Sequence, residues 1–533
     1  MANRNLFGST PIQVPNRSGF DLSHENMLTL KCGQLVPVMT DLLIPGDRVS
    51  VGSAFEIQLP PMATDFYGRV RFKMEAFFVP CRLLYGGWQK FMTSPTGNNA
   101  PSAVSVSSML PYCVVPAANA SVLGRASLAD YLGYKGTVNT RQRINNILRF
   151  MAYHKIYDDW YRDSRIQKPV FDESVPVSST ATSLGVATLP FQGISGSSTL
   201  SYGEATKFAD GVDLFSLRQR NWARDYFTNA TPLPQAGTGA SLSFDVANDS
   251  GSFTIASLRA ANSLQQWLER NNIAGNRYAD QIKAHFGVMP ADAVTQRAIY
   301  LGSSSSVIYN HSVYQTTSVD GSIAGSSNPF ITVGAKYASP IGSDKSSLVG
   351  DFSVTEFGYL MIIGSIVPDA VYSTGINRDF FRLQIGDFAF PLLQGVGDQP
   401  IYKAELANVG VDGDTMSAME TFGYTQRFAE YKFMEDEVHG GLCDGQSLSA
   451  FALKRSFGTL PNTALGASFL EIPVSYLDDV AASSAAVASD YGAWADIFFQ
   501  YRKTSVLSAY TIPTLGDPHN THIESVPTGG RRL

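Results

Sequence analysis

Hydrophobic and polar residues alternate along several stretches of the chain, and the clearest is VRFKMEAFFVP, Val70 to Pro80. Successive side chains of a β-strand point to opposite faces of its sheet, so strict alternation predicts a strand that is buried on one face. The apolar positions of this stretch are Val70, Phe72, Met74, Ala76 and Phe78. Arg71, Lys73 and Glu75 lie on the other face, which predicts a half-buried strand that ends at Pro80.

The same alternation recurs near both ends of the chain. Evenly spaced apolar residues from Val49 to Leu59 follow the turn signal Pro45-Gly46-Asp47, which predicts antiparallel pairing among the strands of the first 80 or so residues. Strand signals return at about 353 and continue to about 513. The longest apolar run, 357–367, is shorter than the roughly 20 residues of a membrane helix, so we expect a buried strand and no membrane insertion.

The spacing of apolar residues changes to a helical period in two places. From about Thr140 they recur every three or four residues as far as Trp160, and Pro169 closes the segment. A second helix is expected over 254–272, with Thr254 as its N-cap and Gly275 just beyond its end.

Two long stretches, 174–203 and 302–328, are rich in serine, threonine and glycine, which is typical of exposed loops. Strands at both ends with helices and polar loops between them favour a mainly β, antiparallel sandwich with enlarged connections. We expect a single domain over 1–533, with most strands in roughly 20–85 and 350–515. The range of roughly 86–349 should then hold inserted loops and helices, with 174–203 as a candidate exposed outer loop.

Composition adds a hint about partners. Apolar residues make up 44% of the chain and charged residues only 16%, below the roughly 25% of an average soluble domain. A surface with few charges is typical of a protein that is covered by other chains. The net charge of −6 has the wrong sign for a protein that holds nucleic acid by itself. The N-terminal stretch has no apolar segment of signal-peptide type, so nothing indicates secretion.

Residues able to perform chemistry are scattered. No glycine-rich phosphate-binding motif and no G-x-S-x-G motif occurs. His519 and His522 lack a nearby third ligand, so an ordinary polar tail is favoured over a metal site. The four cysteines have neither zinc-site spacing nor the density of a disulfide framework, and we expect buried thiols in a reducing compartment. They are Cys32, Cys81, Cys113 and Cys443.

Two groups of carboxylates have alternative interpretations. On a β-sandwich, Glu435 and Glu437 of EDEVHGG could serve glycoside hydrolysis or a calcium site, but a solvated loop is favoured. Asp158 and Asp159 lie on the first predicted helix near Arg162, where surface ion pairs at i,i+3 or i,i+4 are favoured over catalysis. We therefore predict no catalytic, cofactor-binding or metal site.

Arginines are interleaved with aromatic residues in RQRNWARDYF, 218–227. Surfaces that bind single-stranded nucleic acid use this combination. Protein interfaces use it too, and that interpretation is favoured. The candidate interface residues are Arg218, Arg220, Trp222, Arg224 and Tyr226.

Six segments, in order along the chain, together carry a family resemblance. They are FDLSHENMLTLKCGQLVPVMTDLLIPGD (20–47), FFVPCRLLYGGWQKFMT (77–93), LRFMAYHKIYDDWYRD (148–163), RDYFTNATPLPQ (224–235), WLERNNIAGNRYADQIKAHFGVMPADAVTQRAIYLG (267–302) and FGYTQRFAEYKF (422–433). In these segments the chain resembles the major capsid proteins of microviruses, small tailless bacteriophages with circular single-stranded DNA. The similarity is greatest to the gokushovirus-like branch.

The resemblance implies an eight-stranded antiparallel jelly roll and a wedge-shaped subunit without catalytic activity. It also implies a small icosahedral (T=1) virion shell of about 60 copies, assembled in the host bacterial cytoplasm. Partners would be a minor capsid or pilot protein and a receptor on the bacterial surface. In gokushovirus-like relatives a surface protrusion usually follows the segment that matches TPLPQ, but here the stretch 236–252 is short and 174–203 is enlarged.

Charge balance predicts a further partner. Packaged single-stranded DNA carries one negative charge per nucleotide, which a chain with a net charge of −6 cannot offset. We therefore expect a small, strongly basic internal DNA-binding protein or polyamines, and the resemblance implies such a protein. Candidates for genome-facing contacts are the terminal residues Arg4, Arg17, Arg531 and Arg532.

Two other functions are compatible with parts of the sequence. A glycan-binding or glycan-cleaving β-sandwich would depend on the carboxylates around Glu435, and replacing them would abolish its activity. A nucleic-acid-binding module would use the arginine and aromatic residues, and its binding would weaken steeply with salt. Neither explains the six dispersed family segments.

Overall fold

The structure is a computed structural model of the chain. It describes residues 17–59, 66–85, 123–135, 146–170, 214–234, 255–275, 277–308, 341–407, 420–457, 464–477 and 492–508, together with residues 88, 92, 110, 112–115, 142–144, 186–189, 198–201, 312–314 and 336–338.

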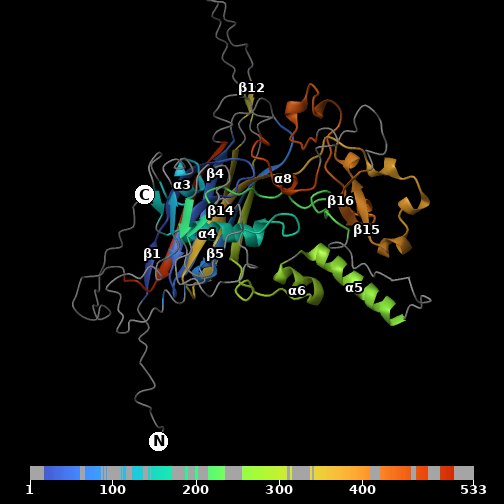
Figure 1. Cartoon of the computed structure of the whole chain (residues 1–533). Helices are drawn as coiled ribbons and strands as arrows, with labels where there is room; N and C mark the ends of the chain where they lie inside the picture. Colours follow the sequence, from blue (N-terminus) through green and yellow to red (C-terminus); the bar gives the residue numbers. More distant parts are fainter. Residues whose placement is uncertain are drawn as a thin grey trace, which may run out of the picture.

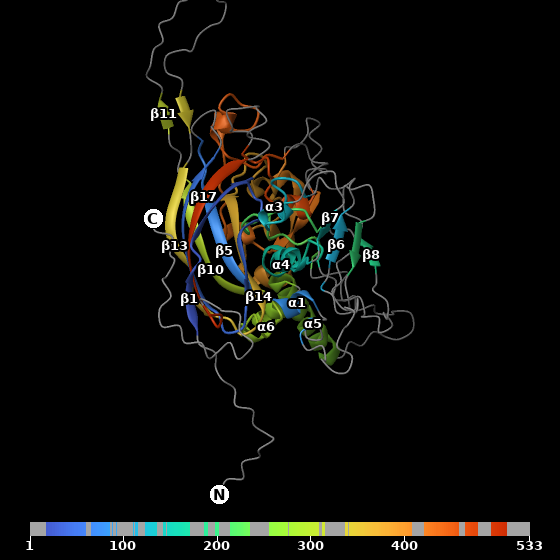
Figure 2. The same ribbon diagram turned by 90° about the vertical axis from the view of Figure 1, so that its left-hand side faces the viewer.

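Two antiparallel sheets pack face to face at one end of the molecule (Figures 1 and 2). The first, called here the β4 sheet, contains β1 (Ser18–Asp21), β2 (His24–Leu30), β17 (Ala493–Ser505), β4 (Arg48–Gln58) and β13 (Ile341–Ser353). The second, the β5 sheet, has the order β10 (Ile299–Ile308), β5 (Val70–Pro80), β14 (Gly358–Pro368) and β3 (Val36–Leu43). The expectation of a mainly β, antiparallel capsid-type sandwich is confirmed.

Alternation places the core between the two sheets. Every second residue of β17 is buried from Ala493 to Tyr501, and β4 alternates in the same way. On β5, the predicted apolar face from Val70 to Phe78 is buried. Phe72 packs edge-to-face on Phe55 of the opposite sheet, with ring centroids 4.9 Å apart. This core stabilises the sandwich by removing apolar surface from water.

The successive strands β3, β4 and β5 lie alternately in the two sheets. β3 pairs with β14, whereas β4 pairs with β17 and β13, so the turn Pro45-Gly46-Asp47 crosses from one sheet to the other. Gly46 has a φ of +93°, a conformation that favours glycine. The predicted antiparallel pairing among the first strands is therefore wrong, because their partners come from the second half of the chain.

The second face of the β5 sheet is covered by helices, so this sheet is buried on both faces (Figure 2). The covering elements are α1 (Cys81–Leu84), α3 (Leu128–Tyr131), α4 (Leu148–Ile156) and the π-helical turn η3 (Tyr157–Tyr161). All 11 residues of β14 are buried in consequence, as expected for the run 357–367. The first predicted helix is thus present, but it begins at Leu148, and Gln142–Ile144 form a strand instead.

Strands also occur in the range expected to hold insertions. β10 and most of β13 belong to the two large sheets although they lie within or across 86–349. β6 (Tyr112–Val115), β7 (Gln142–Ile144), β8 (Val186–Leu189) and β9 (Ser198–Ser201) form a separate sheet, and β11 (Ser312–Tyr314) pairs with β12 (Lys336–Ala338). The candidate outer loop 174–203 thus contributes β8 and β9, and its exposure stays a prediction.

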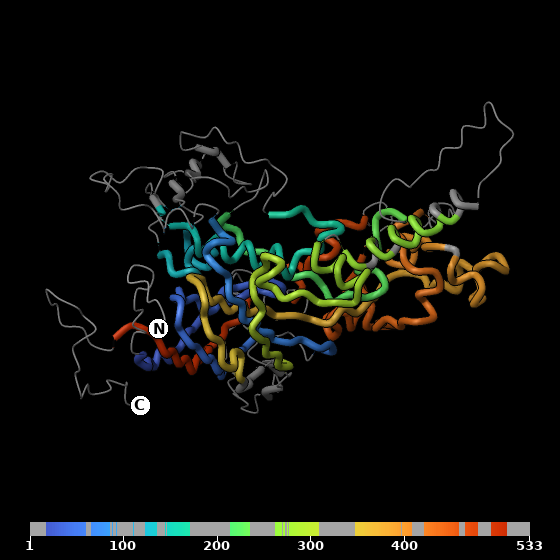
Figure 3. Tube along the Cα trace, turned by 90° about the horizontal axis from the view of Figure 1, so that it is seen from below, coloured from blue at the N-terminus to red at the C-terminus, as the bar shows by residue number. Residues whose placement is uncertain are grey.

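The described residues between 369 and 477 form what we call the lobe, and its elements β15 and β16 lie at the far end from the sheets (Figures 1 and 3). Its regular elements are β15 (Asp398–Tyr402), β16 (Thr421–Gln426), α8 (Ala467–Leu470) and the 3₁₀ helices η4 (Arg378–Phe381), η5 (Ile385–Asp387), η6 (Pro391–Val396), η7 (Lys403–Glu405), η8 (Ala429–Tyr431), η9 (Gly440–Leu442) and η10 (Ser449–Phe451). A small aromatic cluster of its own forms the interior, including Tyr372, Phe422 and Phe469.

Two helices beside the lobe, α5 (Ile255–Ala274) and α6 (Tyr278–Phe286), form what we call the arm (Figures 1 and 3). α5 matches the second predicted helix, and Gly275 follows it with a φ of +107°. Thr254 lies outside the described residues. Among the helices that the structure describes, none is long and apolar enough to cross a membrane.

Candidate assembly surfaces

The segment 214–234 joins the sandwich to the lobe, and most of the predicted interface residues lie on its inner side. Arg220 forms a bidentate ion pair with Glu75 on β5, at 2.6 Å for Nη1–Oε2 and 3.2 Å for Nη2–Oε1. Tyr161 donates its hydroxyl to the same carboxylate. Burial opposes ionisation of Glu75, but the hydrogen bonds and charge of Arg220 outweigh it and lower the pKa of Glu75.

Arg218 lies against the helical cover of the β5 sheet. Its Nε contacts His154 Nδ1 at 3.3 Å, and its guanidinium lies 5.5 Å from the ring centroid of Tyr157. Burial, with a smaller contribution from the charge of Arg218, lowers the pKa of His154 to about 3. This histidine is therefore a neutral core residue that contacts the Leu214 carbonyl, 2.9 Å from its Nε2.

Trp222 and Tyr226 pack at the junction with the lobe. The buried guanidinium of Arg455 lies 4.7 Å from the Trp222 ring centroid and 4.5 Å from that of Phe469, within a cage of aromatic rings. Arg455 also donates to the Phe469 carbonyl at 2.7 Å. Tyr226 donates its hydroxyl to Glu405 at 3.1 Å. These contacts connect the lobe to the sandwich within one subunit.

Arg224 is the one predicted interface residue whose side chain is largely exposed, at 60%, and its nearest carboxylate is Asp163 at 3.8 Å. As contacts between copies, all five residues stay predictions, and Arg224 is the best placed of them. Arg17 is exposed at the start of the described chain. Arg4, Arg531 and Arg532 lie outside the described residues, as do His519 and His522.

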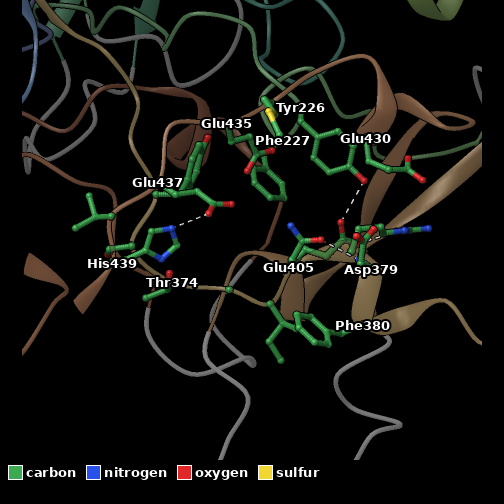
Figure 4. Close-up of a pocket in the computed structure, with 18 of the residues that line it drawn as sticks. Tyr226, Phe227, Thr374, Asp379, Phe380, Glu405, Glu430, Glu435, Glu437 and His439 are labelled. Carbon is green, nitrogen blue, oxygen red and sulfur yellow. Dashed lines mark hydrogen bonds and ion pairs between the residues drawn. The ribbon is translucent and has the colours of Figure 1, made fainter. Parts of the chain in front are cut away.

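A cavity of about 810 Å³ opens in the lobe between the segments 372–382 and 430–443 (Figure 4). Arg378 on one wall donates to Glu405 at 2.6 Å, and Glu437 on the other pairs with His439 at 3.1 Å. Aromatic and apolar side chains line the remainder, including Phe380, Phe433 and Met434. The cavity thus combines an acidic lining with an apolar rim.

Glu435 is the most perturbed carboxyl of this cavity. Partial burial raises its pKa to about 8, and the charges of Asp225, Glu405 and Glu437 add to the effect. A carboxyl with a raised pKa in a cleft is a general feature of functional sites, so the glycan-cleaving alternative has a geometric counterpart here. The groups around Glu435 are other carboxylates. Among the described residues, no three His, Cys, Asp or Glu side chains are placed to bind a metal ion.

Asp158 and Asp159 are buried, at 9% and 7% exposure, although surface pairs were expected. The i,i+4 pair of Asp158 with Arg162 is as predicted, and Asp159 pairs with Lys155. Asp159 also accepts from the backbone N–H of Ala298 at 2.9 Å. The surface placement was wrong because the π-helical turn is buried: Asp159 lies at the residue before β10, whereas Asp158 accepts from the backbone N–H of Val170, and both have a structural role.

Cys32 and Cys81 are buried thiols, as predicted. Burial raises the pKa of Cys81 to about 12, which leaves it unreactive. Cys443 is only half-buried and lies at the cavity, so the expectation of burial was wrong for it.

The largest anomaly of the subunit is apolar surface on the lobe. Leu392 and Met434 are 92% and 94% exposed. Other exposed large side chains of the same region are Phe380, Leu383, Ile385, Phe388, Phe390, Tyr431 and Phe433. Soluble monomers rarely expose apolar patches of more than a few hundred Å², and larger ones mark interaction sites. We therefore interpret this part of the lobe as an interaction surface.

The arm carries a second apolar surface. Phe286 is 78% exposed at the end of α6, and Trp267 on α5 is half-exposed although it stacks on His285. Further exposed apolar residues of the arm and the turn that follows it are Leu264, Tyr278, Val288, Met289 and Val294. Sequence reasoning identified this helix but missed both apolar surfaces. The signal was a dense apolar content without a period of 2 or 3.6, as in FFRLQIGDFAFPLLQ (380–394).

Comparison with known proteins decides among the functions. Residues 10–249 and 240–515 match the model of one protein family, described as capsid protein (F protein). The chain belongs to this phage capsid protein family. It is 26% identical to capsid protein VP1 of Chlamydia phage 1 and 24% identical to that of Bdellovibrio phage phiMH2K, over 96% of this chain and 98% of each relative. It is also 26% identical to capsid protein VP1 of Spiroplasma virus 4, over 84% of this chain and 86% of that protein.

Membership of the capsid protein family confirms the predicted resemblance and gives the chain a structural role in a microvirus capsid. It also gives the exposed apolar surfaces a reason, because a capsid subunit is surrounded by other subunits. The glycan-binding alternative is not favoured, since full-length similarity to capsid proteins leaves the Glu435 cavity as a local feature of a structural protein.

Proposed function

We propose that about 60 copies of this chain close into an icosahedral shell around circular single-stranded DNA. The observation that carries the proposal is the combination of capsid family membership with two uncovered apolar surfaces, on the lobe and on the arm. The double-sheet sandwich supplies a rigid wedge, and the exposed regions supply the contacts. No catalytic step is part of this role.

The shell requires a cationic companion. The chain carries a net charge of −6, whereas each nucleotide of the genome adds one negative charge. We therefore include a small basic internal DNA-binding protein among the proposed partners, with Arg17 and the terminal Arg4, Arg531 and Arg532 as further contacts to the genome.

Other proposed partners follow from the family rather than from a described site. They are a minor capsid or pilot protein and a receptor on the bacterial surface, with 174–203 as the segment proposed to reach the host. Assembly is proposed to take place in the cytoplasm of the host, and the shell then forms the outside of the virion.

The test is to express the full chain with its companion gene products and to examine the lysate by sedimentation and electron microscopy. Uniform particles of icosahedral outline, with this chain as their main component, are the expected result. The proposal fails if the chain sediments only as a folded monomer or small oligomer, or if purified virions contain it only in traces.

A further inference from the structure

We propose that the arm of one copy docks on the lobe of the next copy, with its basic side chains at the acidic cavity and its apolar residues on the exposed apolar surface. This inference rests on the proposed shell and names two of the surfaces that meet in it. Three observations support it: the arm is incompletely packed, the two surfaces have matching apolar chemistry, and their charges are opposite.

Most side chains that the structure describes on α5 are exposed or only half-buried in the isolated subunit. The 20 residues of α5 span roughly 30 Å, and among the described elements α5 packs extensively only against α6. The connection to the sandwich is made by Arg277, which donates to the carbonyls of Asp158 and Arg162 at 2.6 and 2.7 Å. Most helical stability in proteins comes from packing of an apolar face, and Leu264 and Trp267 lack that cover. A partner must supply it.

The lobe offers a surface of the matching kind. Phe380, Phe433 and Met434 stand at the rim of the cavity, and the exposed side chains of 383–392 extend the same apolar chemistry along the lobe. Apolar side chains on the arm and on the lobe would exclude water from each other when the two surfaces meet. Basic side chains on the arm can then enter a cavity of about 810 Å³ that is open to solvent in the isolated subunit.

Charge favours contact of the arm with the lobe over the other possible contacts between copies. Arg259, Arg270 and Lys283 are the exposed charged residues whose side chains the structure describes on α5 and α6. Between 420 and 444 the lobe carries six carboxylates and only two basic residues. Contacts of arm with arm, or of lobe with lobe, would bring like charges together, which is unfavourable at an interface. Contact of arm with lobe joins unlike surfaces, and such head-to-tail contacts generate closed rings where the rotation between copies closes.

The test reverses charge on each surface separately and then on both. The arm variant is Arg270→Glu/Lys283→Glu, and the lobe variant is Asp379→Lys/Glu437→Lys, which changes two exposed carboxylates at the cavity. Each is expressed as the full chain with its companion products. Particle yield is measured by sedimentation and microscopy, and thermal unfolding of unassembled subunits shows whether each variant folds. Arg270→Lys/Lys283→Arg is the matched control that keeps the charge.

Each reversal alone is expected to reduce the particle yield at least about tenfold, which corresponds to a penalty of about 1.4 kcal/mol per contact. Combining both reversals in one chain is expected to restore particles, because the arm is then acidic, the lobe is basic, and the two surfaces attract each other again. The control should assemble like the unaltered chain. The inference is overturned if the arm variant assembles normally, or if the combined variant folds but does not assemble.

Two further outcomes separate this inference from the proposed function and from another occupant. If the unaltered chain forms no particles at all, the proposed function fails. If the lobe variant forms normal particles that lack the basic companion protein, that protein occupies the cavity and the docking of the arm is refuted.

Discussion

β14 and the segment 380–394 of the lobe are both rich in apolar residues, yet β14 is buried and the lobe segment is largely exposed. All 11 residues of β14 are buried, because β3 and β5 pair with its edges while the β4 sheet and the helices cover its faces. In the lobe segment, most large apolar side chains are exposed on short 3₁₀ helices. Apolar content alone therefore does not define the core. The sandwich is complete within one chain, whereas we propose that the lobe is completed by other chains.

The largest effect on the isolated subunit is expected from Phe72→Ala. Phe72 is fully buried between the sheets, and its removal leaves a cavity that the surrounding strands cannot close. The expected loss of unfolding free energy is about 3–5 kcal/mol, measured by urea unfolding of unassembled subunits. A loss below about 1 kcal/mol would show that the sandwich is not the rigid part of the molecule.

Arg220→Ala should destabilise the subunit by about 3 kcal/mol, since it leaves the largely buried Glu75 carboxylate without its partner. Replacing both residues, as Arg220→Met/Glu75→Leu, should recover most of this loss. Because the pKa of Glu75 is lowered in the folded state, its pair contributes stability above the unfolded pKa and loses it as the pH falls through the folded pKa. Stability of the double variant should thus depend less on acid pH, and an unchanged pH profile would contradict the ion pair.

Glu435→Gln tests the lobe. The folded pKa of about 8 lies above the ordinary 4.5, so this carboxyl contributes stability at low pH and loses it as the pH rises toward 8. The variant should match the unaltered subunit at pH 5 and exceed its unfolding free energy at pH 8.5 by about 1 kcal/mol, a figure reduced for partial exposure. Glu437→Gln, at an exposed neighbour, is the control and should show a smaller difference. Equal profiles for all three proteins would rule out the raised pKa.

The smallest effect on the isolated subunit is expected from Leu392→Ser. This side chain is 92% exposed, so its loss should change the unfolding free energy by less than about 0.5 kcal/mol. Particle yield should nevertheless fall, because the same side chain is covered in the shell. A large fall in subunit stability would mean that the lobe surface already has a partner within the chain.

Alternation sufficed to locate β5, β4 and β17, because each strand buries at least one face and every second residue is therefore apolar. Pairing could not be derived in the same way. The partners of β3 and β4 lie some 300–450 residues away, and no local signal favours them over the adjacent strand. The helix 254–272 was predictable because α5 is long and amphipathic, whereas Gln142–Ile144 was mistaken for helix because Ile144 continues an apolar spacing across a strand.

The candidate surfaces were less accessible to sequence reasoning. Arginine beside aromatic residues predicted an interface at 218–227, but the same composition occurs at Arg220, inside the subunit, and at Arg224, on its surface. Only the fold separates the two cases, by placing Glu75 opposite one of them. The raised pKa of Glu435 depends on Asp225 and Glu405, which are distant in sequence and come together only when the lobe forms.

β17 lies in the interior of its sheet, with β4 on one edge and β1 and β2 on the other. It ends at Ser505, so its partner strands β1, β2 and β4 are synthesised hundreds of residues earlier. During translation the β4 sheet therefore lacks its central strand until β17 has been synthesised. Products that terminate before β17 lack the central strand of this sheet, so their sandwich is incomplete.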